Sequence, residues 1–94
     1  MPSKRDIRQW TTLYRGLGNQ NRLRILQLLK ERKRLSVSEL ARELNITIKN
    51  TSRNLNILSN LDLVRFQGGQ GRVYYFLNSR MPVEISKILE ISIA

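Results

Sequence analysis

The sequence contains no cysteine and no histidine. Without cysteine there is no disulfide framework and no thiolate metal site, and without histidine the commonest transition-metal ligand and the usual general base near neutral pH are missing. The seven acidic residues and the scattered serines and lysines do not assemble into an acid, base and nucleophile set. We therefore predict that the chain is not an enzyme and uses no metal or other cofactor.

Long apolar runs are also missing. The longest, Val73 to Leu77, is far shorter than the roughly 20 residues of a membrane-spanning helix. The first ten residues contain no apolar stretch typical of a signal peptide. We expect no membrane association and, by default, a cytoplasmic location. No linker, repeat or low-complexity tract divides residues 1–94, so a single domain is predicted.

Acidic residues are few in relation to basic ones. Seventeen lysines and arginines against seven acids give a net charge of +10, and twelve of the seventeen are arginine. Arginine presents a planar fork of donors that suits phosphates and guanine edges. Such a charge can serve solubility alone, or attract an anionic membrane surface. In a chain this small we interpret it as the sign of a polyanionic partner.

Apolar residues at helical spacing predict a first helix over about 5–16, ended by glycines, and a second, largely apolar helix that Asn19 caps. The second helix is expected at the centre of the domain. A third helix over about 36–44 is predicted because Ser36 and Glu39 stand at the spacing of a capping box.

A tight turn at Asn45 leads to a fourth helix, capped by Thr47 and reaching about Leu61. Placing its residues 100° apart puts Thr51, Leu55 and Leu58 in one sector that should face the core, with Ile48 on its flank. The opposite side carries Lys49, Arg53, Asn56 and Asn60, flanked by Asn50 and Ser52.

Two β-rich runs, "LVRF" and "RVYYFL", flank "QGGQG" and predict a hairpin over 63–78. Pro82 separates this hairpin from a last helix over about 83–93. The order predicts an α+β, mainly helical fold, a winged helix-turn-helix in which residues 36–61 form the helix-turn-helix and the hairpin forms a two-stranded wing.

The polar side of the fourth helix predicts contact with DNA. Lys49 and Arg53 suit guanine edges, Asn50 and Asn56 suit adenine, and residues 47–61 contain no carboxylate that phosphates would repel. The alternative is that these asparagines are only solvated positions in a weak helix. Further contacts to phosphate are predicted from two helix starts and from the wing. These contacts use Thr47, Arg22, Gln70 and Arg72.

Residues 17–78 resemble the ArsR-type winged-helix repressors. The resemblance rests on "NRLRILQLL", "SVSELARELNIT", "TSRNLNILSNLDLV" and "GRVYYFL", in this order and spacing. It implies a homodimer that pairs through its first and last helices and represses transcription at inverted repeats. By position it places Thr47, Asn50, Ser52 and Arg53 on the DNA-contacting stretch. The implied dimer surface consists of Ile7, Trp10, Tyr14, Ile85, Ile88 and Leu89.

The sequence departs from the family pattern in three ways. Asn54 stands where histidine is usual, and Asp62 stands where glycine ends the recognition helix, which aspartate tolerates because it can adopt a left-handed backbone. The cysteine and histidine ligands of the metal-sensing members are missing, so metal sensing is not expected and the effector is unknown.

The residues of the implied dimer surface have an alternative role. Trp10 and Ile88 could simply close the core of the monomer rather than contact a second copy.

We therefore predict a sequence-specific regulator that binds double-stranded DNA as a homodimer. Two alternatives remain open: a winged helix used as a protein–protein interaction module, and a nonspecific architectural DNA-binding protein. RNA binding is disfavoured because the few aromatic residues fall in the expected core or wing strands.

Overall fold

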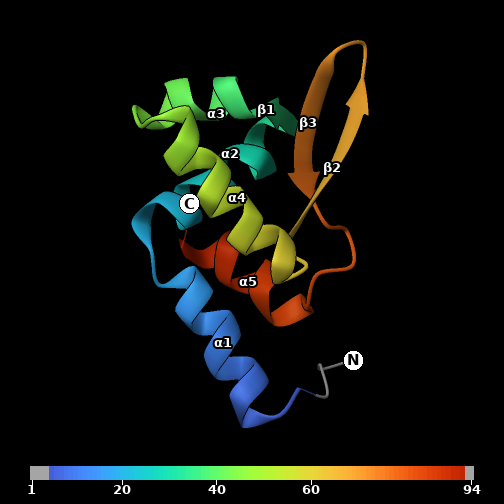
Figure 1. Ribbon diagram of the computed structural model, residues 1–94. Helices are drawn as coiled ribbons and strands as arrows, with labels where there is room; N and C mark the ends of the chain where they lie inside the picture. Colours follow the sequence, from blue (N-terminus) through green and yellow to red (C-terminus); the bar gives the residue numbers. More distant parts are fainter. Residues whose placement is uncertain (1–4, 93–94) are drawn as a thin grey trace.

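Five helices and three strands follow one another in a computed structural model that describes residues 5–92 (Figure 1). The predicted winged helix-turn-helix, α+β and mainly helical, is confirmed. In chain order the elements are α1 (Ile7–Leu17), α2 (Gln20–Arg32), β1 (Arg34–Ser36), α3 (Val37–Leu44), α4 (Ile48–Asn60), β2 (Val64–Gly69), β3 (Arg72–Leu77) and α5 (Val83–Ser92). Residue 93, the predicted end of the last helix, lies outside the described residues.

Side-chain caps begin the two helices of the helix-turn-helix where the sequence predicted them. The Ser36 hydroxyl accepts from the Glu39 amide at 3.2 Å, and Glu39 Oε1 accepts from the Ser36 amide at 2.9 Å. The Thr47 hydroxyl accepts from the Asn50 amide at 3.0 Å. Each cap satisfies an amide that has no partner inside the helix, and thereby fixes the residue at which the helix starts.

Left-handed residues end the same two helices. Asn45 after α3 has φ 57°, and Asp62 after α4 has φ 60°. Around Asp62, the amide of Leu63 donates to the carbonyl of Leu58, and the amide of Asp62 donates to that of Ser59, both at 3.0 Å. This is the bond pattern of a Schellman motif. The prediction that aspartate takes the left-handed position at the exit of α4 is confirmed.

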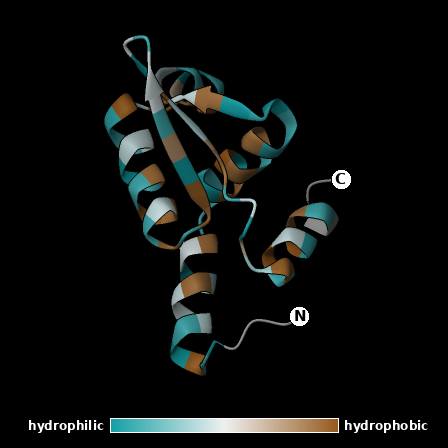
Figure 2. Ribbon diagram, turned by 90° about the vertical axis from the view of Figure 1, so that its right-hand side faces the viewer, coloured by the Kyte–Doolittle hydropathy of each residue, from teal (hydrophilic) through white to brown (hydrophobic). Residues whose placement is uncertain are grey.

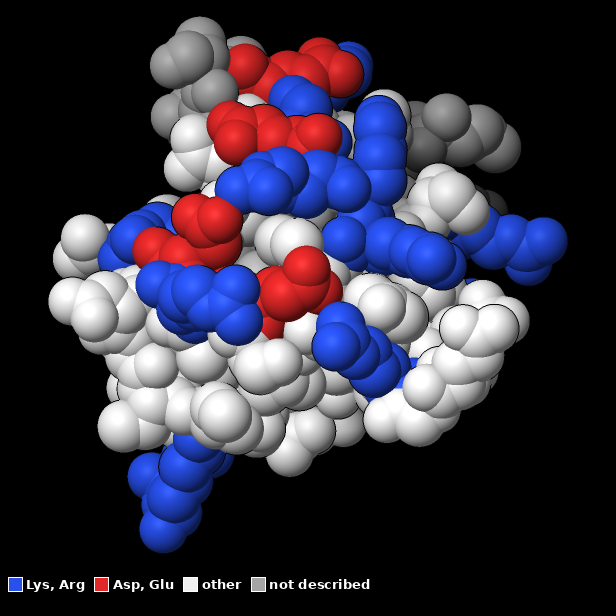
Figure 3. All heavy atoms as spheres, turned by 90° about the horizontal axis from the view of Figure 1, so that it is seen from above, with Lys and Arg blue, Asp and Glu red and all other residues white. Residues whose placement is uncertain are grey.

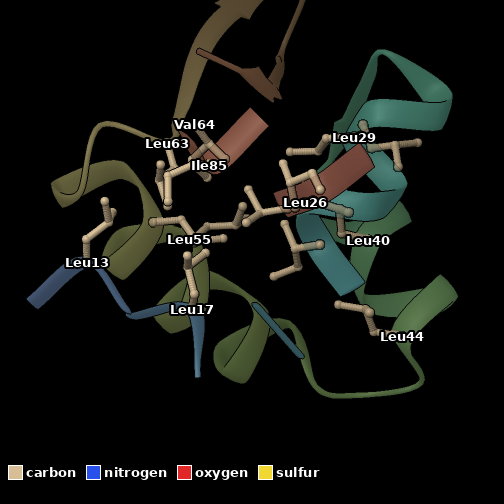
Figure 4. Close-up of a cluster of buried hydrophobic side chains, with 14 residues drawn as sticks. Leu13, Leu17, Leu26, Leu29, Leu40, Leu44, Leu55, Leu63, Val64 and Ile85 are labelled. Carbon is tan, nitrogen blue, oxygen red and sulfur yellow. The ribbon is translucent and has the colours of Figure 1, made fainter. Parts of the chain in front are cut away.

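The core forms around α2, α4 and α5. Figure 4 shows the cluster, to which Ile25, Leu26, Leu55 and Leu58 contribute side chains with no exposed surface. Burying an aliphatic side chain stabilises the fold by about 1.5–3 kcal/mol before the entropy of ordering is subtracted. The central place predicted for the second helix is therefore confirmed.

The last helix corrects one part of the sequence analysis. Ile85 and Leu89, predicted as dimer contacts, are 0% and 2% exposed, and Figure 4 shows Ile85 with Leu63 and Val64 in the core cluster. They are not available to a partner in this structure, because the core of the single chain already covers them. Ile88 is half-buried against the same core.

The sheet has three strands rather than the predicted two, in the order β1-β3-β2, all antiparallel. Strand β1 was not predicted, because it is only three residues long and its partner β3 lies far along the chain. Beyond β1, the β2–β3 hairpin rises past the helices as a wing (Figure 1). Its two-residue tip, Gln70 (φ 51°) and Gly71 (φ 78°), has the double positive φ of a type I′ turn.

Helix α1 extends away from the body of the molecule (Figures 1 and 2). Its last turn is anchored by the buried Leu13 and Leu17, whereas Ile7 at its start is 80% exposed. Gly16 does not end the helix as predicted. It lies inside α1, where a Cβ atom would collide with Leu61, so glycine allows the close approach to the end of α4. Within residues 5–92, none of the helices combines the length and apolar character needed to cross a membrane.

Candidate nucleic-acid interface

Helix α4 has one buried side and one polar exposed side. Thr51, Leu55 and Leu58 have no exposed surface, as predicted, whereas Ile48 is 57% exposed and does not join the core flank. The exposed polar residues are Lys49, Asn50, Arg53, Asn56 and Asn60, with Ser52 half-buried beside them. We call these six residues the polar face of α4. Helix α4 itself lies on the side of the molecule that faces the viewer in Figure 1.

Three side chains of the polar face have no polar partner in the described part of the protein. Within residues 5–92, the side chains of Lys49, Arg53 and Asn56 make no hydrogen bond or ion pair. A long cationic side chain without a partner in the protein is free to bind an external anion or a base edge. The polar face is therefore able to receive a ligand without first breaking internal contacts at these positions.

The start of α4 adds a positive end of the helix dipole near the polar face. Thr47 holds this start with two bonds, because its carbonyl also accepts from the Thr51 hydroxyl at 2.8 Å. Helix starts of this kind attract phosphate oxygens. The Thr47 hydroxyl is thus used as a cap, and its predicted contact with phosphate stays a prediction.

Arg22 has internal partners that the sequence did not reveal. Its Nε donates to the carbonyl of Gly16, and its Nη1 donates to Asn54 Oδ1 at 2.9 Å. Asn54 is 5% exposed and lies on the buried side of α4. Two of the three guanidinium nitrogens of Arg22 are already bonded inside the protein, and its predicted phosphate contact stays a prediction.

The wing presents more arginine than the sequence analysis counted. Gln70 and Arg72, the two predicted wing residues, are both exposed at or beside the tip. The register pairs Phe76 with Arg65 on one side and with Arg34 on the other, which places these two arginines on the same face of the sheet as Arg72. The alternation of side chains along β2 would have placed Arg65 on this face from the sequence. Arg34 could not be placed there, because its strand β1 was not predicted.

A groove of about 600 Å³ lies along this arginine-bearing face of the sheet. The Arg34 guanidinium lies over the Tyr74 ring, 4.6 Å from its centroid, and both residues line the groove. A cation over an aromatic face is attracted by the ring quadrupole, which holds Arg34 in place. The lining consists of Lys33, Arg34, Gln67, Gly68, Gly69, Gln70, Tyr74 and Phe76, with no carboxylate among them.

The charges are unevenly spread over the surface. Seen from above, acidic side chains lie among lysines and arginines in the upper half of the view, whereas the lower part shows basic and uncharged side chains (Figure 3). That lower edge is the side of the molecule on which α4 lies (Figure 1). A surface free of carboxylates is what a polyanion requires, because phosphates repel them.

The structure brings together the three dimer residues predicted on α1. The Trp10 and Tyr14 rings stack with centroids 5.6 Å apart, and Tyr14 and Ile7 are 49% and 80% exposed. Trp10 is half-buried and packs against the core, which fits part of the alternative that it closes the monomer. Within the described residues, no group of three or more histidines, cysteines or carboxylates is placed to hold a metal ion.

Comparisons with known proteins agree with this architecture. Residues 17–65, just over half of the chain, match the family described as "Helix-turn-helix domain". A comparison with curated proteins gives no significant match.

Three solved structures illustrate the likeness. The transcriptional regulator HlyU from Vibrio vulnificus CMCP6 is 28% identical, with a TM-score of 0.74 over 89% of this chain and 83% of that one. The homodimeric winged helix-turn-helix DNA-binding domain Mb0332 from Mycobacterium bovis, a possible ArsR-family transcriptional regulator, is 23% identical, with a TM-score of 0.76 over 98% and 86%. The transcriptional repressor BigR from Xylella fastidiosa is 21% identical, with a TM-score of 0.77 over 90% and 83%.

Proposed function

Because the chain belongs to the ArsR-type family of helix-turn-helix regulators, we propose that it binds specific sites on double-stranded DNA and represses transcription from them as a homodimer. The proposal includes no catalytic step and no cofactor. The regulators to which the chain is similar are described as a transcriptional regulator, a homodimeric DNA-binding domain and a repressor.

The observation that carries the proposal is the polar face of α4. A single helix fits the major groove, where arginine and lysine read guanine and asparagine reads adenine. Lys49, Arg53 and Asn56 are exposed and unoccupied, and the helix bears no carboxylate. The exposed wing arginines would contact the sugar-phosphate backbone beside the groove, which contributes affinity rather than base selection.

The apolar strip on α1, with Ile7 and Tyr14 exposed and Trp10 half-buried between them, supports the homodimer. An apolar strip at the far end of a projecting helix is removed from water when a second copy packs against it. Two copies related by a two-fold axis would place their α4 helices in successive major grooves, about 34 Å apart. Such an arrangement reads an inverted repeat.

Selection of bound duplexes from a random DNA pool tests the proposal. At about 0.15 M salt, phosphate attraction is partly screened and base-specific contacts decide which duplexes are retained. We expect an inverted repeat whose half-sites are one helical turn apart. A retained pool without a common sequence would instead favour an architectural role, and the absence of any retained DNA would favour a protein-interaction module.

A further inference from the structure

A series of side-chain hydrogen bonds through the buried Asn54 runs from α2 to the polar face of α4. Arg22 Nη1 donates to Asn54 Oδ1 at 2.9 Å, and Asn54 Nδ2 donates to Asn50 Oδ1 at 3.0 Å. The same Nδ2 also donates to the Asn50 carbonyl at 3.0 Å. Arg22 is half-buried, Asn54 is buried and Asn50 is exposed, so these bonds pass through the buried side of α4 and end on the surface proposed to read DNA.

Arg22 determines which atom donates and which accepts in each of these hydrogen bonds. A guanidinium has only donors, so the Asn54 atom that faces it must be the carbonyl oxygen Oδ1. The Asn54 amide nitrogen then points toward Asn50, and both of its protons are used in the two bonds to that residue. The Asn50 atom that faces Asn54 must in turn be an acceptor, its Oδ1.

Arg22 is itself held in place. Its Nε donates to the Gly16 carbonyl at the end of α1, and its backbone amide donates to Asn19 Oδ1 at 3.1 Å in the cap of α2. The backbone bond fixes Arg22 in the first turn of α2 and the Nε bond orients its guanidinium, so the side chain loses little additional freedom when Nη1 binds Asn54. The orientation of the Asn54 amide is therefore imposed by the packing of α1, α2 and α4.

We infer that Arg22 and Asn54 are positioning residues that fix the amide of Asn50 with Oδ1 toward the helix and Nδ2 toward the DNA. This inference rests on the proposed function. An asparagine held this way offers a donor, which suits base edges that carry acceptors, namely N7 or O6 of guanine, N7 of adenine and O4 of thymine. Cytosine presents an amino donor in the major groove and is disfavoured.

The test measures base preference at one operator position. The Asn50→Ala variant identifies this position, because it should lose the base preference only there. At the same position the wild-type protein should disfavour cytosine by about threefold to tenfold, which corresponds to one hydrogen bond. Asn54→Asp keeps an acceptor for Arg22 but removes the donor to Asn50. The amide of Asn50 should then turn over and present its oxygen, which shifts the preference toward cytosine or the amino group of adenine.

Two variants and one spectroscopic measurement control this experiment. The amide introduced by Arg22→Gln can either donate to Asn54 or accept from it, so it no longer fixes the orientation of the Asn54 amide. This variant should relax the base preference at the Asn50 position rather than reverse it. Ser79→Asp adds the same charge to an exposed position outside the polar face of α4 and should leave that preference unchanged. In the free wild-type protein, side-chain amide proton exchange measured by NMR should be slow for Asn54 and fast for Asn50.

The outcomes separate the inference from the proposed function. If folded Asn54→Asp and Arg22→Gln proteins bind the operator with the wild-type preference at that position, the inference is overturned while DNA reading stands. Fast exchange of the Asn54 amide protons would also overturn it, even if Asn54→Asp failed to fold. If the wild-type protein selects no DNA sequence, both the proposed function and the inference fall.

Discussion

Arg53 gives a direct test of base reading by one side chain. It is exposed on the polar face of α4 and has no partner within residues 5–92. If it contacts a guanine edge, Arg53→Ala should cost about 1–3 kcal/mol of operator affinity and relax the preference at one base pair. Fluorescence anisotropy with operator and random duplexes at one salt concentration measures both effects.

Arg72→Ala is the matched control for this variant. It removes the same charge from an exposed site on the wing, where contact with the backbone is expected. Its loss of affinity should be similar for operator and random DNA, and the slope of log K against log salt should fall by about 1. Equal losses on both duplexes for Arg53→Ala would remove Arg53 from the base-reading residues.

Glu39 gives a prediction about stability and pH. The Ser36 amide, and after it the Ser36 hydroxyl, bind the carboxylate and lower the pKa of Glu39 below its ordinary value of 4.5. A lowered pKa in the folded state stabilises the fold above the unfolded-state pKa, and this contribution is lost as the pH falls through the folded value. The wild-type protein should therefore lose more stability below about pH 4.5 than Glu39→Gln does.

Urea unfolding followed from about pH 6 downwards measures this difference, because the Glu39 carboxylate is charged at the start and takes up a proton as the pH falls through its lowered pKa. Glu90→Gln, at an exposed position of α5, serves as the control and should follow the wild-type dependence on pH. An identical change in the urea midpoint for the wild-type and Glu39→Gln proteins would show that the capping box does not depend on the charge of Glu39.

Asn78 joins the base of the wing to the exit of α4. It is buried, its Nδ2 donates to the Asp62 carbonyl at 2.8 Å, and its Oδ1 accepts from the Arg80 amide at 3.0 Å. Asn78→Ala would leave both partners without these bonds and should lower the free energy of unfolding by about 1–3 kcal/mol. Ser79→Ala, at the exposed neighbouring position, is the control.

Urea unfolding measured by circular dichroism provides the comparison of these two variants. Because Asp62 is the left-handed residue of the Schellman motif, loss of the Asn78 bond should also loosen the link between α4 and the wing. Equal stability of the two variants would mean that water replaces the side-chain bonds of Asn78 at no net cost.

Local signals made the helix-turn-helix predictable. Caps and stops act within a few residues, so Ser36, Thr47, Asn45 and Asp62 marked where α3 and α4 begin and end. The apolar sector of α4 likewise followed from a spacing of 100° per residue, and its buried members were found as predicted. These parts of the site depend on bonds that neighbouring residues in the sequence make with one another.

Long-range relations were not predictable in the same way. Periodicity shows which residues share a face of a helix and not what covers that face, so Ile85 and Leu89 were assigned to a partner although the core covers them. Strand β1 is three residues long and is defined by its pairing with β3. The bond between Arg22 and Asn54 joins residues 32 positions apart, and only the folded arrangement of α2 and α4 brings them together.

The molecule as a whole has its wing at one end and α1 projecting from the other (Figure 1). In the proposed function, this separation would allow one end to bind DNA while the other binds a second copy. Since Ile85 and Leu89 are buried in the core, the exposed apolar surface proposed for the dimer is reduced to α1 with a contribution from the half-buried Ile88. The strongest effect on assembly is therefore expected from α1.

Ile7→Lys places a charge at the most exposed apolar residue of α1 without disturbing the core, because Ile7 is 80% exposed. Burying an unpaired ammonium in an apolar interface is unfavourable, so this variant should be monomeric at concentrations where the wild-type protein is dimeric. Thr12→Lys adds the same charge to an exposed polar position of α1 and should remain dimeric.

Analytical ultracentrifugation distinguishes the monomer from the dimer. Titration with duplexes that carry one or two half-sites measures the consequence for DNA affinity. The monomeric variant should bind both duplexes with similar affinity, because only a dimer gains from the second half-site. A dimeric Ile7→Lys protein that still prefers the two-site duplex would exclude this end of α1 from the interface.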